Sequence, residues 1–231
     1  YEAWPDPAWS TFIIRKLLEN EKVKNQYINT FADHLNTVYS SETALALIDD
    51  IYGNLVTEMP YHVDKWKTSL ENWNFHVDVV REFARERPAY LRKFIIEKFD
   101  LDGLMDVLIV YPGAEVAKVT FNSLKIREDF EGIYFQNIPV TISVEPKHDY
   151  NFVGWKDRKE TTATITVTTN ENLLLEPLFE PKKRSVLKDS IIFNEILADE
   201  TPSFGLPTFE FIEFKNLTAD TLYTEGWILS D

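Results

Sequence analysis

The chain has 231 residues, of which 44% are hydrophobic and 14% aromatic, which is enough apolar material for one large domain or for two or three small ones. Its 24 Lys and Arg residues against 38 Asp and Glu residues give a net charge of −14, which repels phosphate backbones and anionic lipids and excludes nucleic acids and membrane insertion from the expected partners. The absence of cysteine excludes a disulfide framework, a thiolate nucleophile and a cysteine-ligated metal site.

Apolar residues recur at helical spacing from about Trp9 to Phe99, which predicts five amphipathic helices in a helical subdomain over residues 1–102. Ser41 is expected to cap the third helix and Pro60 to close it. The dipeptide Arg87-Pro88 is expected to end the fourth helix and to start the fifth. The side chains expected on the buried face include Ile14, Leu18, Phe31, Leu35, Ile48, Trp73, Phe83 and Phe94.

After about residue 103 the apolar residues recur at every second position instead. Val140–Glu145 and Ala163–Thr168 alternate strictly between apolar and polar side chains, which predicts a small antiparallel β module over residues 103–182. The basic link Lys182-Lys183-Arg184 leads into residues 183–231, which are again strand-like but too few to bury a stable core alone. The strand candidates of this last segment are Ile191–Leu197, Phe209–Asn216 and Trp227–Ser230.

The sequence lacks the common motifs of catalysis and cofactor binding. No two histidines stand four residues apart on a predicted helix, and neither a Gly-x-Ser-x-Gly elbow nor a Gly-rich phosphate loop is present. We therefore expect no catalytic, cofactor-binding or metal-binding residues and no cofactor. The isolated histidines and the acidic pairs are interpreted as packed or solvated side chains: His34, His62, His76, His148, Asp49-Asp50 and Glu19/Glu21.

Three weaker patterns leave an alternative open. Asp100, Asp102 and Asp106 superficially resemble a calcium loop, but their place between helix and strand and the missing Glu favour a capping turn. The indole ring of Trp155 could stack on a sugar, although a Trp in such a setting more often packs in the core. Asn216-Leu217-Thr218 is a formal glycosylation sequon, and such short matches are frequent by chance.

The helical segment resembles a known protein family. Trp9–Asn20, followed by Asn25–Thr37, is similar to the C-terminal helical part of the CotH family, which comprises spore-coat-type atypical protein kinases and their secreted relatives. In that family the ATP-gripping Lys and the metal-binding acidic residues precede this part, so the resemblance assigns no site residue here. The similarity continues through Ile48-Asp49, Glu58-Met59-Pro60, Trp66, Trp73 and Phe83–Pro88.

The two β segments resemble modules of bacterial surface proteins. Gly132–Val140, Tyr150–Trp155 and Leu178–Glu180 are similar to small β repeats such as the internalin-B repeat. Asn194-Glu195-Ile196, Phe211–Asn216 and Gly226–Asp231 resemble the first part of a lamin tail domain, an immunoglobulin-like sandwich. The expected fold is therefore multidomain, α and then β: a helical subdomain, an antiparallel β module, and a partial, truncated sandwich over residues 183–231. We expect the chain to be a fragment at both ends.

These resemblances imply two functional hypotheses. In the first, the chain is a non-catalytic piece of a secreted or surface CotH-like bacterial protein, extracellular or at the cell surface, whose β modules serve attachment or partner binding. In the second, it supports a metal-dependent protein kinase whose active site lies upstream of Tyr1. The apolar strand candidates are expected to pair in trans with another copy through Ile191–Asp231 or to lie against the preceding β module.

Overall fold

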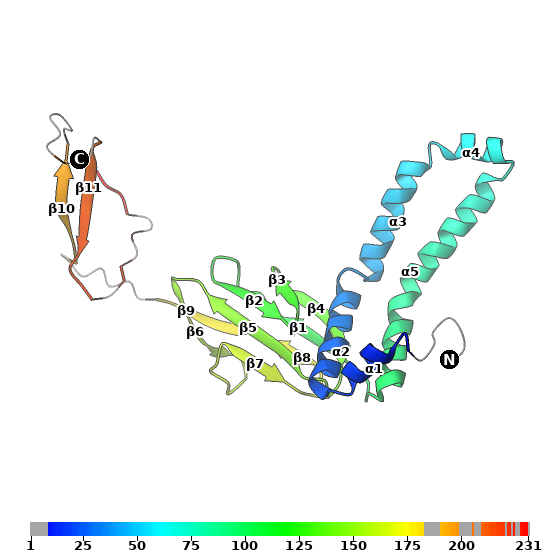
Figure 1. Cartoon of the computed structure of the whole chain (residues 1–231), viewed down its shortest axis with the longest axis horizontal. Coiled ribbons are helices and arrows are strands. Elements are labelled where there is room, and N and C mark those ends of the chain that lie inside the picture. Colours follow the sequence, from blue (N-terminus) through cyan, green and yellow to red (C-terminus); the bar gives the residue numbers. More distant parts are fainter. Residues whose placement is uncertain are drawn as a thin grey trace. The chain divides into compact units, whose positions relative to one another are not determined.

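The computed structural model describes residues 9–182, 190–198, 205, 209–219, 221–222, 224 and 227–230. The chain forms two compact units, Tyr1–Lys182 and Lys183–Asp231. The first unit holds a helical part followed by β sheets, and the second holds a β hairpin (Figure 1). The expected succession of a helical part and antiparallel-rich sheets is confirmed.

Five helices form the helical part of the described residues, but they are not the five expected, because the expected fourth and fifth helices form the single helix Leu70–Phe99 and the helix Met59–Trp66 was not expected. Ser40, not Ser41, caps the third helix, because the Ser40 hydroxyl accepts a hydrogen bond from the Thr43 amide at 3.1 Å. Pro60 lies in the first turn of the next helix, where its missing N–H costs nothing, so it opens a helix instead of closing one. The helices are α1 (Phe12–Leu18), α2 (Glu21–Asn36), α3 (Ser41–Leu55), α4 (Met59–Trp66) and α5 (Leu70–Phe99).

The expected break at Pro88 is wrong, because α5 runs without interruption for 30 residues. A proline inside a helix removes one hydrogen bond and crowds the preceding turn. Here Pro88 is buried on the inner face of α5, and the hydroxyl of Ser41 on α3 donates a hydrogen bond of 2.9 Å to the carbonyl of Arg85 in that preceding turn. The carbonyl that loses its donor to Pro88 is that of Ala84, so the Ser41 contact supports the neighbouring carbonyl of the same turn, and the burial of Pro88 is what favours its place in the helix.

Helices α3 and α5 pack side by side as an antiparallel hairpin closed by α4 (Figure 1). Tyr52 stacks on Trp73 with ring centroids 4.9 Å apart, and the Arg81 guanidinium lies 5.0 Å from the centre of the Tyr52 ring. The expected buried face is confirmed only in part: Leu35 is buried, and the other seven expected residues divide between half-buried and exposed. Leu18, Phe31, Ile48 and Trp73 are half-buried, whereas Ile14, Phe83 and Phe94 are exposed, which corrects the expectation for these three.

The β module consists of two facing sheets and a two-stranded ribbon. One sheet has the order β4-β1-β8 and the other β3-β2-β5-β7, while β6 pairs with β9. All strand pairs of the module are antiparallel except β1 with β8, which is parallel and departs from the expected antiparallel module. The strands are β1 (Leu104–Ile109), β2 (Ala117–Phe121), β3 (Leu124–Ile126), β4 (Phe130–Phe135), β5 (Val140–Pro146), β6 (Tyr150–Trp155), β7 (Thr164–Val167), β8 (Leu173–Leu175) and β9 (Pro177–Pro181).

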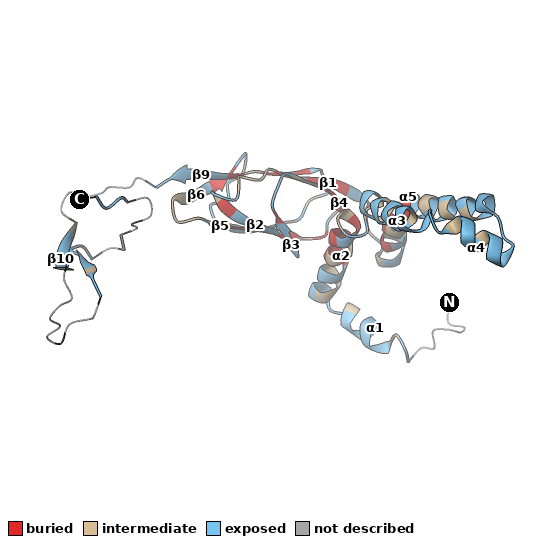
Figure 2. Cartoon of the chain, turned by 90° about the horizontal axis from the view of Figure 1, so that it is seen from above, coloured by how far each residue is buried: buried red, intermediate tan, exposed pale blue. Residues whose placement is uncertain are grey.

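The core of the first unit lies between these sheets and under α2 (Figure 2). Alternate residues of β1, β2 and β5 are buried, as the two-residue spacing predicts. Phe121 of one sheet meets Tyr134 of the other edge to face, with ring centroids 5.1 Å apart. By contrast, no residue of α1, α3 or α4 is buried, so most of the helical arm is exposed (Figure 2).

The second unit contains the antiparallel strands β10 (Ile191–Leu197) and β11 (Phe211–Asn216), with a register shift between Phe193 and Glu195. Two of the three strand candidates are therefore confirmed. Trp227–Ser230 is not a strand; these residues lie beside the hairpin, where Trp227, Ile228 and Leu229 line one pocket together with Phe193 and Phe214. The described part of this unit has a single two-stranded sheet, and a second sheet facing it is not seen there.

A polar face of α2 joins the helical part to the β module. The Asp33 carboxylate is fully buried and accepts hydrogen bonds from the Tyr134 hydroxyl at 2.8 Å and from the Ser123 amide and hydroxyl at 3.0 and 2.6 Å. One helical turn further on, the side-chain amide of Asn36 donates to the carbonyl of Ile133 at 2.9 Å and accepts from its N–H at 3.0 Å. Five hydrogen bonds, three to the Asp33 carboxylate and two with the Asn36 amide group, thus attach α2 to β4 and to the β2–β3 turn, and a further weak contact from Asn122 adds to them.

Two further features of β4 and α5 complete this junction. The guanidinium of Arg92 on α5 donates to the Asn36 oxygen at 2.8 Å. Gly132 on β4 leaves room for α2, because a Cβ at that position would lie 3.0 Å from the Asn36 side-chain nitrogen and 2.9 Å from the Phe130 ring. The close approach of helix and strand therefore depends on the absence of a side chain at Gly132.

We predict that Asp33→Asn lowers the free energy of unfolding by about 2 kcal/mol, because the new NH2 group cannot accept the Ser123 hydrogen bonds and a hydrogen bond to a buried charge is worth about 1.5–3 kcal/mol. Urea unfolding followed by circular dichroism measures this loss as a lower midpoint with an unchanged slope. The matched control is Asp64→Asn, which removes an exposed partner of Lys67 on α4 and is expected to cost less than about 0.5 kcal/mol. Equal losses in the two variants would contradict the structural role of Asp33.

Candidate functional site

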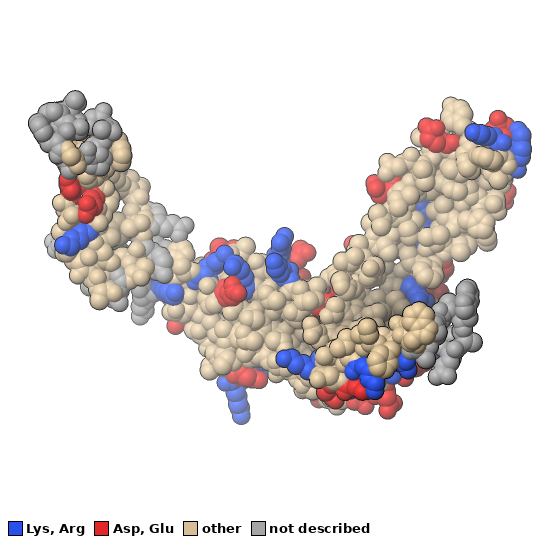
Figure 3. Space-filling view, viewed as in Figure 1, with Lys and Arg blue, Asp and Glu red and all other residues tan. Residues whose placement is uncertain are grey.

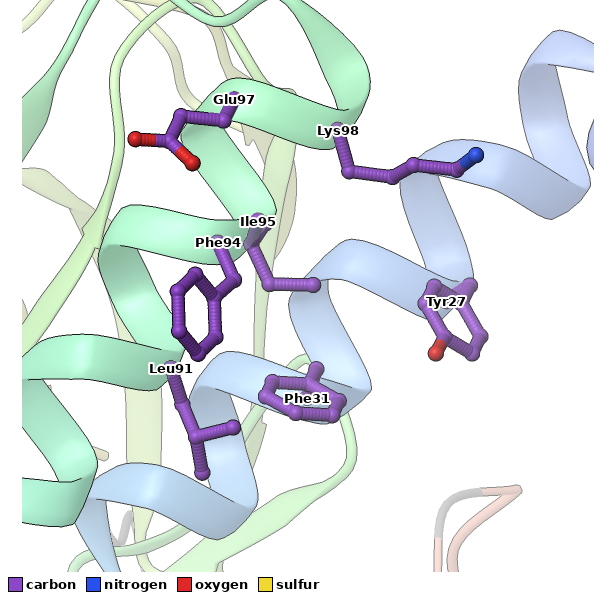
Figure 4. Close-up of a pocket in the computed structure, with 7 residues that line it drawn as sticks. All are labelled: Tyr27, Phe31, Leu91, Phe94, Ile95, Glu97 and Lys98. Atoms are coloured by element: carbon purple, nitrogen blue, oxygen red, sulfur yellow. The ribbon is translucent and has the colours of Figure 1, made fainter. Parts of the chain in front are cut away.

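A shallow apolar groove lies between α2 and α5 and encloses about 500 Å³. Tyr27 and Phe31 stand one turn apart on α2, and Leu91, Phe94 and Ile95 come from the C-terminal part of α5. Figure 4 shows Leu91, Phe94 and Ile95 turned toward Phe31, with Lys98 extended toward α2 and Glu97 pointing the other way. The groove therefore has apolar walls and one cation at its rim, which suits an apolar side chain of a partner better than a polar substrate.

The α3–α5 hairpin has one charged face. Arg81 on α5 forms ion pairs with Asp49 on α3 at 2.7 Å and with Asp78 at 2.9 Å, and Arg85 pairs with Glu82 at 3.0 Å. The hydrogen bonds to Asp49 and Asp78 raise the pKa of Arg81 above its ordinary value. These contacts link the two helices on the side where their charged residues gather.

The opposite face of the hairpin is apolar. At 100° per residue, Leu47 and Ile51 of α3 and Val80 and Phe83 of α5 lie on the same side of the hairpin, away from the charged face. Leu47 and Phe83 are 60% and 61% exposed. Figure 3 shows few charged side chains along the middle of the arm in that view, with charges at its tip and edges. An exposed apolar surface of this extent is typical of a protein interaction site.

Helix α1 adds further apolar residues to the surface of the helical part. It has no buried residue, and Phe12, Ile13 and Leu17 are exposed along its seven residues. The apolar groove, the apolar hairpin face and α1 together form the candidate functional site, and each is suited to binding another polypeptide. No helix in the described ranges is both long enough and apolar enough to cross a membrane.

Two ionisable groups with shifted pKa values, Tyr134 and Arg92, lie in the α2–β4 junction and not in a cleft. Burial, followed by the charge of Asp33, raises the pKa of Tyr134 far above its ordinary value, and burial lowers the pKa of Arg92. Tyr134 is fully buried and its hydroxyl already donates to Asp33. Tyr134 and Arg92 therefore stabilise the contact between α2, α5 and the β module, and their burial keeps a substrate from reaching them.

The residues considered in the sequence as candidate ligands lie apart from one another. His34, His62 and His76 each contact an aromatic ring, of Tyr39, Trp66 and Phe75 respectively, and His148 lies 3.0 Å from the Asp149 carboxylate. Among the residues that the structure describes, no group of three His, Asp or Glu side chains is arranged to hold a metal ion.

Asp100, Asp102 and Asp106 have separate partners. Asp100 ends α5 as its left-handed C-cap, with φ of 53°. The Asp102 carboxylate accepts a hydrogen bond from Asn137 at 2.6 Å, and Asp106 exchanges hydrogen bonds with the side chain of Asn172. The backbone of Asp100 thus ends the helix, and the side chains of Asp102 and Asp106 serve the following turn and the edge of β1.

Trp155 lies in the core and not on a binding surface. It is 3% exposed, its indole N–H donates to the Thr162 carbonyl at 3.0 Å, and Phe152 packs against it edge to face at 5.4 Å. A sugar could not stack on this ring without opening the β6–β9 ribbon. The side chain of Asn216 accepts hydrogen bonds from the amide and hydroxyl of Thr218 at 2.8 Å, within the sequon.

Comparison with known proteins identifies the helical part. A family model described as CotH kinase protein matches residues 1–91. The helical region is CotH-like. The match covers α1 to α4 and α5 as far as Leu91, so it includes the hairpin and the whole of α2 but does not reach the β sheets. No curated protein and no solved structure matches the chain.

The sequence analysis missed the polar junction face of the CotH-like region. Asn29, Asp33 and Asn36 are spaced four and three residues apart on α2, and polar residues at that spacing usually mark a solvated helix face. The signal that distinguishes them is the pattern of flanking apolar residues, since Ile28, Ala32 and Leu35 on the adjacent face are buried too. Asn29 donates to the Pro139 carbonyl at 2.7 Å, so all three side chains contact the β module.

We predict that calcium at millimolar concentration leaves the melting temperature unchanged, because the carboxylates of Asp102 and Asp106 are bonded to Asn137 and Asn172 and do not converge on one site with Asp100. Calcium at 100 times its dissociation constant would stabilise a bound protein by about 2.7 kcal/mol, which corresponds to several degrees. Thermal unfolding with and without calcium checks this. A rise of several degrees that disappears in Asp106→Asn would show that the carboxylates do form a site.

Proposed function

We propose that this chain is a non-catalytic support and docking part of a CotH-like bacterial protein that is secreted or attached to the cell surface. The observation that carries the proposal is the exposed apolar face of the CotH-like α3–α5 hairpin, which the Asp33 junction fixes to a β module. A helical arm with one face held by ion pairs and the other left apolar presents a rigid surface to another polypeptide.

The chemistry of the described residues favours docking over catalysis. Phosphoryl transfer needs a phosphate cradle, a Lys that reaches the phosphates and carboxylates that hold Mg²⁺. The described carboxylates do not gather in a metal-holding group, and the side chains of Tyr134 and Arg92, whose pKa values are shifted, are engaged in the junction. The groove between α2 and α5 is apolar and suits a hydrophobic side chain.

The alternative proposal is that the chain supports a metal-dependent protein kinase whose active site lies upstream of Tyr1. The description of the family that matches residues 1–91, CotH kinase protein, favours this alternative. In that case the apolar face of α3 and α5 packs against a catalytic lobe, and Leu47, Ile51 and Phe83 are contact residues of that lobe. Both proposals assign a supporting role to the helices. In the first the helices dock another polypeptide, and in the second they support a kinase catalytic lobe.

We predict that the chain neither binds ATP with Mg²⁺ nor transfers its phosphate. Isothermal calorimetry with magnesium-ATP should give no saturable heat, because the described carboxylates and basic residues form no phosphate and metal site. The kinase alternative predicts that binding appears once the sequence encoded before Tyr1 is included. Micromolar affinity for magnesium-ATP in the 231-residue chain itself would overturn both proposals.

The β segments are proposed to be accessory modules for attachment, a surface β repeat over residues 103–182 and the first part of a lamin tail-like sandwich over residues 183–231. Support for the second comes from the β10–β11 hairpin, whose apolar residues Phe193, Ile196 and Phe214 are 53%, 58% and 50% exposed. A two-stranded sheet has two free edges, and each edge offers unpaired N–H and C=O groups to another strand. We propose that the segment Ile191–Asp231 pairs in trans with a strand of a second copy.

We predict that the amides of Ile191–Leu197 and Phe211–Asn216 gain protection from hydrogen exchange as the protein concentration rises, because pairing in trans occupies the free edges. The internal control is β5, an inner strand between β2 and β7, whose amides should be protected equally at every concentration. Protection of β10 and β11 that does not depend on concentration would contradict strand pairing in trans.

A further inference from the structure

The four-stranded sheet of the β module carries basic residues on its outer face, at the point where β3 ends. Buried and exposed residues alternate along β2, so Lys118 and Thr120 point away from the core. Lys125 of β3 stands opposite Thr120, and the same register, continued by one residue, brings Arg127 opposite Lys118. Lys147 directly follows β5, the other neighbour of β2 in this sheet. We call Lys118, Lys125, Arg127 and Lys147 the basic cluster.

All four members of the basic cluster line one pocket of about 520 Å³. Tyr111 and Thr120 also line it, and in the described ranges their hydroxyl groups have no hydrogen-bond partner within the protein. Ala114 adds an apolar wall. Pockets of this volume commonly hold small molecules, and a few polar groups in such a pocket fix the orientation of the ligand.

Positive charge gathers in this pocket against the trend of the chain. Of the eight Lys and Arg residues between positions 103 and 182, four line the pocket, whereas one of the twelve Asp and Glu residues does so. That residue is Glu145, which pairs with Lys118 at 3.3 Å. Lys125, Arg127 and Lys147 form no ion pair with any residue that the structure describes. Neighbouring like charges oppose folding, so stability alone does not account for the basic cluster.

The hydrogen-bond donors of the pocket suit carboxylates. Proteins commonly hold a phosphate group with several backbone N–H groups at a helix N-terminus or in a tight turn. Here the amides of Tyr111, Val116 and Ala117 already donate hydrogen bonds within the protein. The available donors are therefore side chains, namely the guanidinium fork of Arg127, which matches the two oxygens of a carboxylate, and the ammonium groups of the two unpaired lysines.

The surroundings of the pocket favour a compact ligand. Glu128 and Asp129 follow Arg127 and line the neighbouring pocket beside the end of α2, and the whole chain carries a net charge of −14. A long polyanion would extend beyond the basic cluster and meet this negative charge, since exposed charges interact over about 8–10 Å at physiological salt. A small molecule with two or three carboxylates keeps its charge within the pocket.

We propose that the basic cluster binds a small di- or tricarboxylate. Lys125, Arg127 and Lys147 each supply a charge-assisted hydrogen bond to it, and the hydroxyl groups of Tyr111 and Thr120 supply further polar contacts. Binding also neutralises the repulsion among the unpaired cations. This site lies in the β module alone, so it does not depend on what the helical arm contacts or on whether the chain supports a kinase.

Isothermal calorimetry on the full 231-residue chain tests this site, with citrate and succinate as probes and the ionic strength held constant. We expect saturable binding of at least one of them, about tenfold or more tighter than binding of acetate, because several carboxylates engage the cluster at once. Arg127→Gln and Lys147→Gln should each weaken this binding about tenfold or more, since each removes a hydrogen bond between charged groups. The matched control is Lys159→Gln, an exposed lysine of the same β module outside the pocket, which should change the affinity by less than about twofold.

Thermal unfolding without a ligand separates a binding role of Arg127 from a structural one. Arg127→Gln removes one of several neighbouring like charges, so the variant should melt at the same temperature as the natural sequence or at a higher one. A clearly lower melting temperature would show that Arg127 stabilises the fold and would contradict its assignment to a ligand.

Two further results would overturn the proposal: no saturable heat with either citrate or succinate, or binding that Arg127→Gln and Lys147→Gln leave unchanged. Two competing ligands are tested in the same way. Inorganic phosphate or a tetra-aspartate peptide that binds more tightly than both probes would also overturn it, because the pocket would then prefer a phosphate group or an acidic polypeptide.

Discussion

The first unit depends on one buried carboxylate. Asp33 is removed from water by the contact between α2 and the β module, and burying a charge without hydrogen-bond donors would oppose folding strongly. Ser123 and Tyr134 supply those donors from two different sheets, so the charge is compensated only when both sheets and the helix are in place. The interaction is specific for this reason, since an apolar contact would tolerate a rotation or shift of α2 and a carboxylate with three directed donors does not.

The junction also explains why the helical arm can remain exposed. α5 is anchored near its C-terminus, where Arg92 and Ile95 are buried, and it runs about 45 Å in total. Beyond this base, contacts between α3 and α5 hold the arm together, namely the Tyr52–Trp73 stack and the Arg81 ion pairs. The inner and charged faces of the arm carry its stability, and the opposite apolar face stays exposed in the described part of the chain.

The sequence predicts the elements of this fold better than their contacts. Two-residue alternation at Val140–Glu145 and Ala163–Thr168 is a local signal, and β5 and β7 lie there. Pro88 was expected to break the helix because of the local penalty of a helical proline, but packing buries Pro88, and the Ser41 hydroxyl, 44 positions before Arg85, bonds the Arg85 carbonyl in the same turn. Such contacts have no local signature in the sequence.

The same limit applies to the site. Asp33 and Asn36 read as solvated helix residues because nothing within α2 indicates that Tyr134 and Ile133, about 100 positions later, lie opposite them. The exposed stripe of Phe83 and Phe94 was predicted to be buried because helical spacing identifies an apolar face without saying what covers it. Trp227–Ser230 has the composition of a strand, but strand formation needs a neighbouring strand with free backbone groups, and composition cannot supply one.

The side chain of Asn36 makes the pair of hydrogen bonds that the backbone of a neighbouring strand would otherwise make. β4 is the edge strand of its sheet, and Asn36 both donates to and accepts from Ile133, as a neighbouring strand residue would. The helix thus closes a sheet edge that would otherwise attract other chains. Loss of the Asn36 side chain would have a second cost beyond lost stability, because the uncovered backbone at Ile133 would offer a free edge to other partly folded chains during synthesis. One side-chain amide thus contributes to the solubility of the folding protein as well as to its stability.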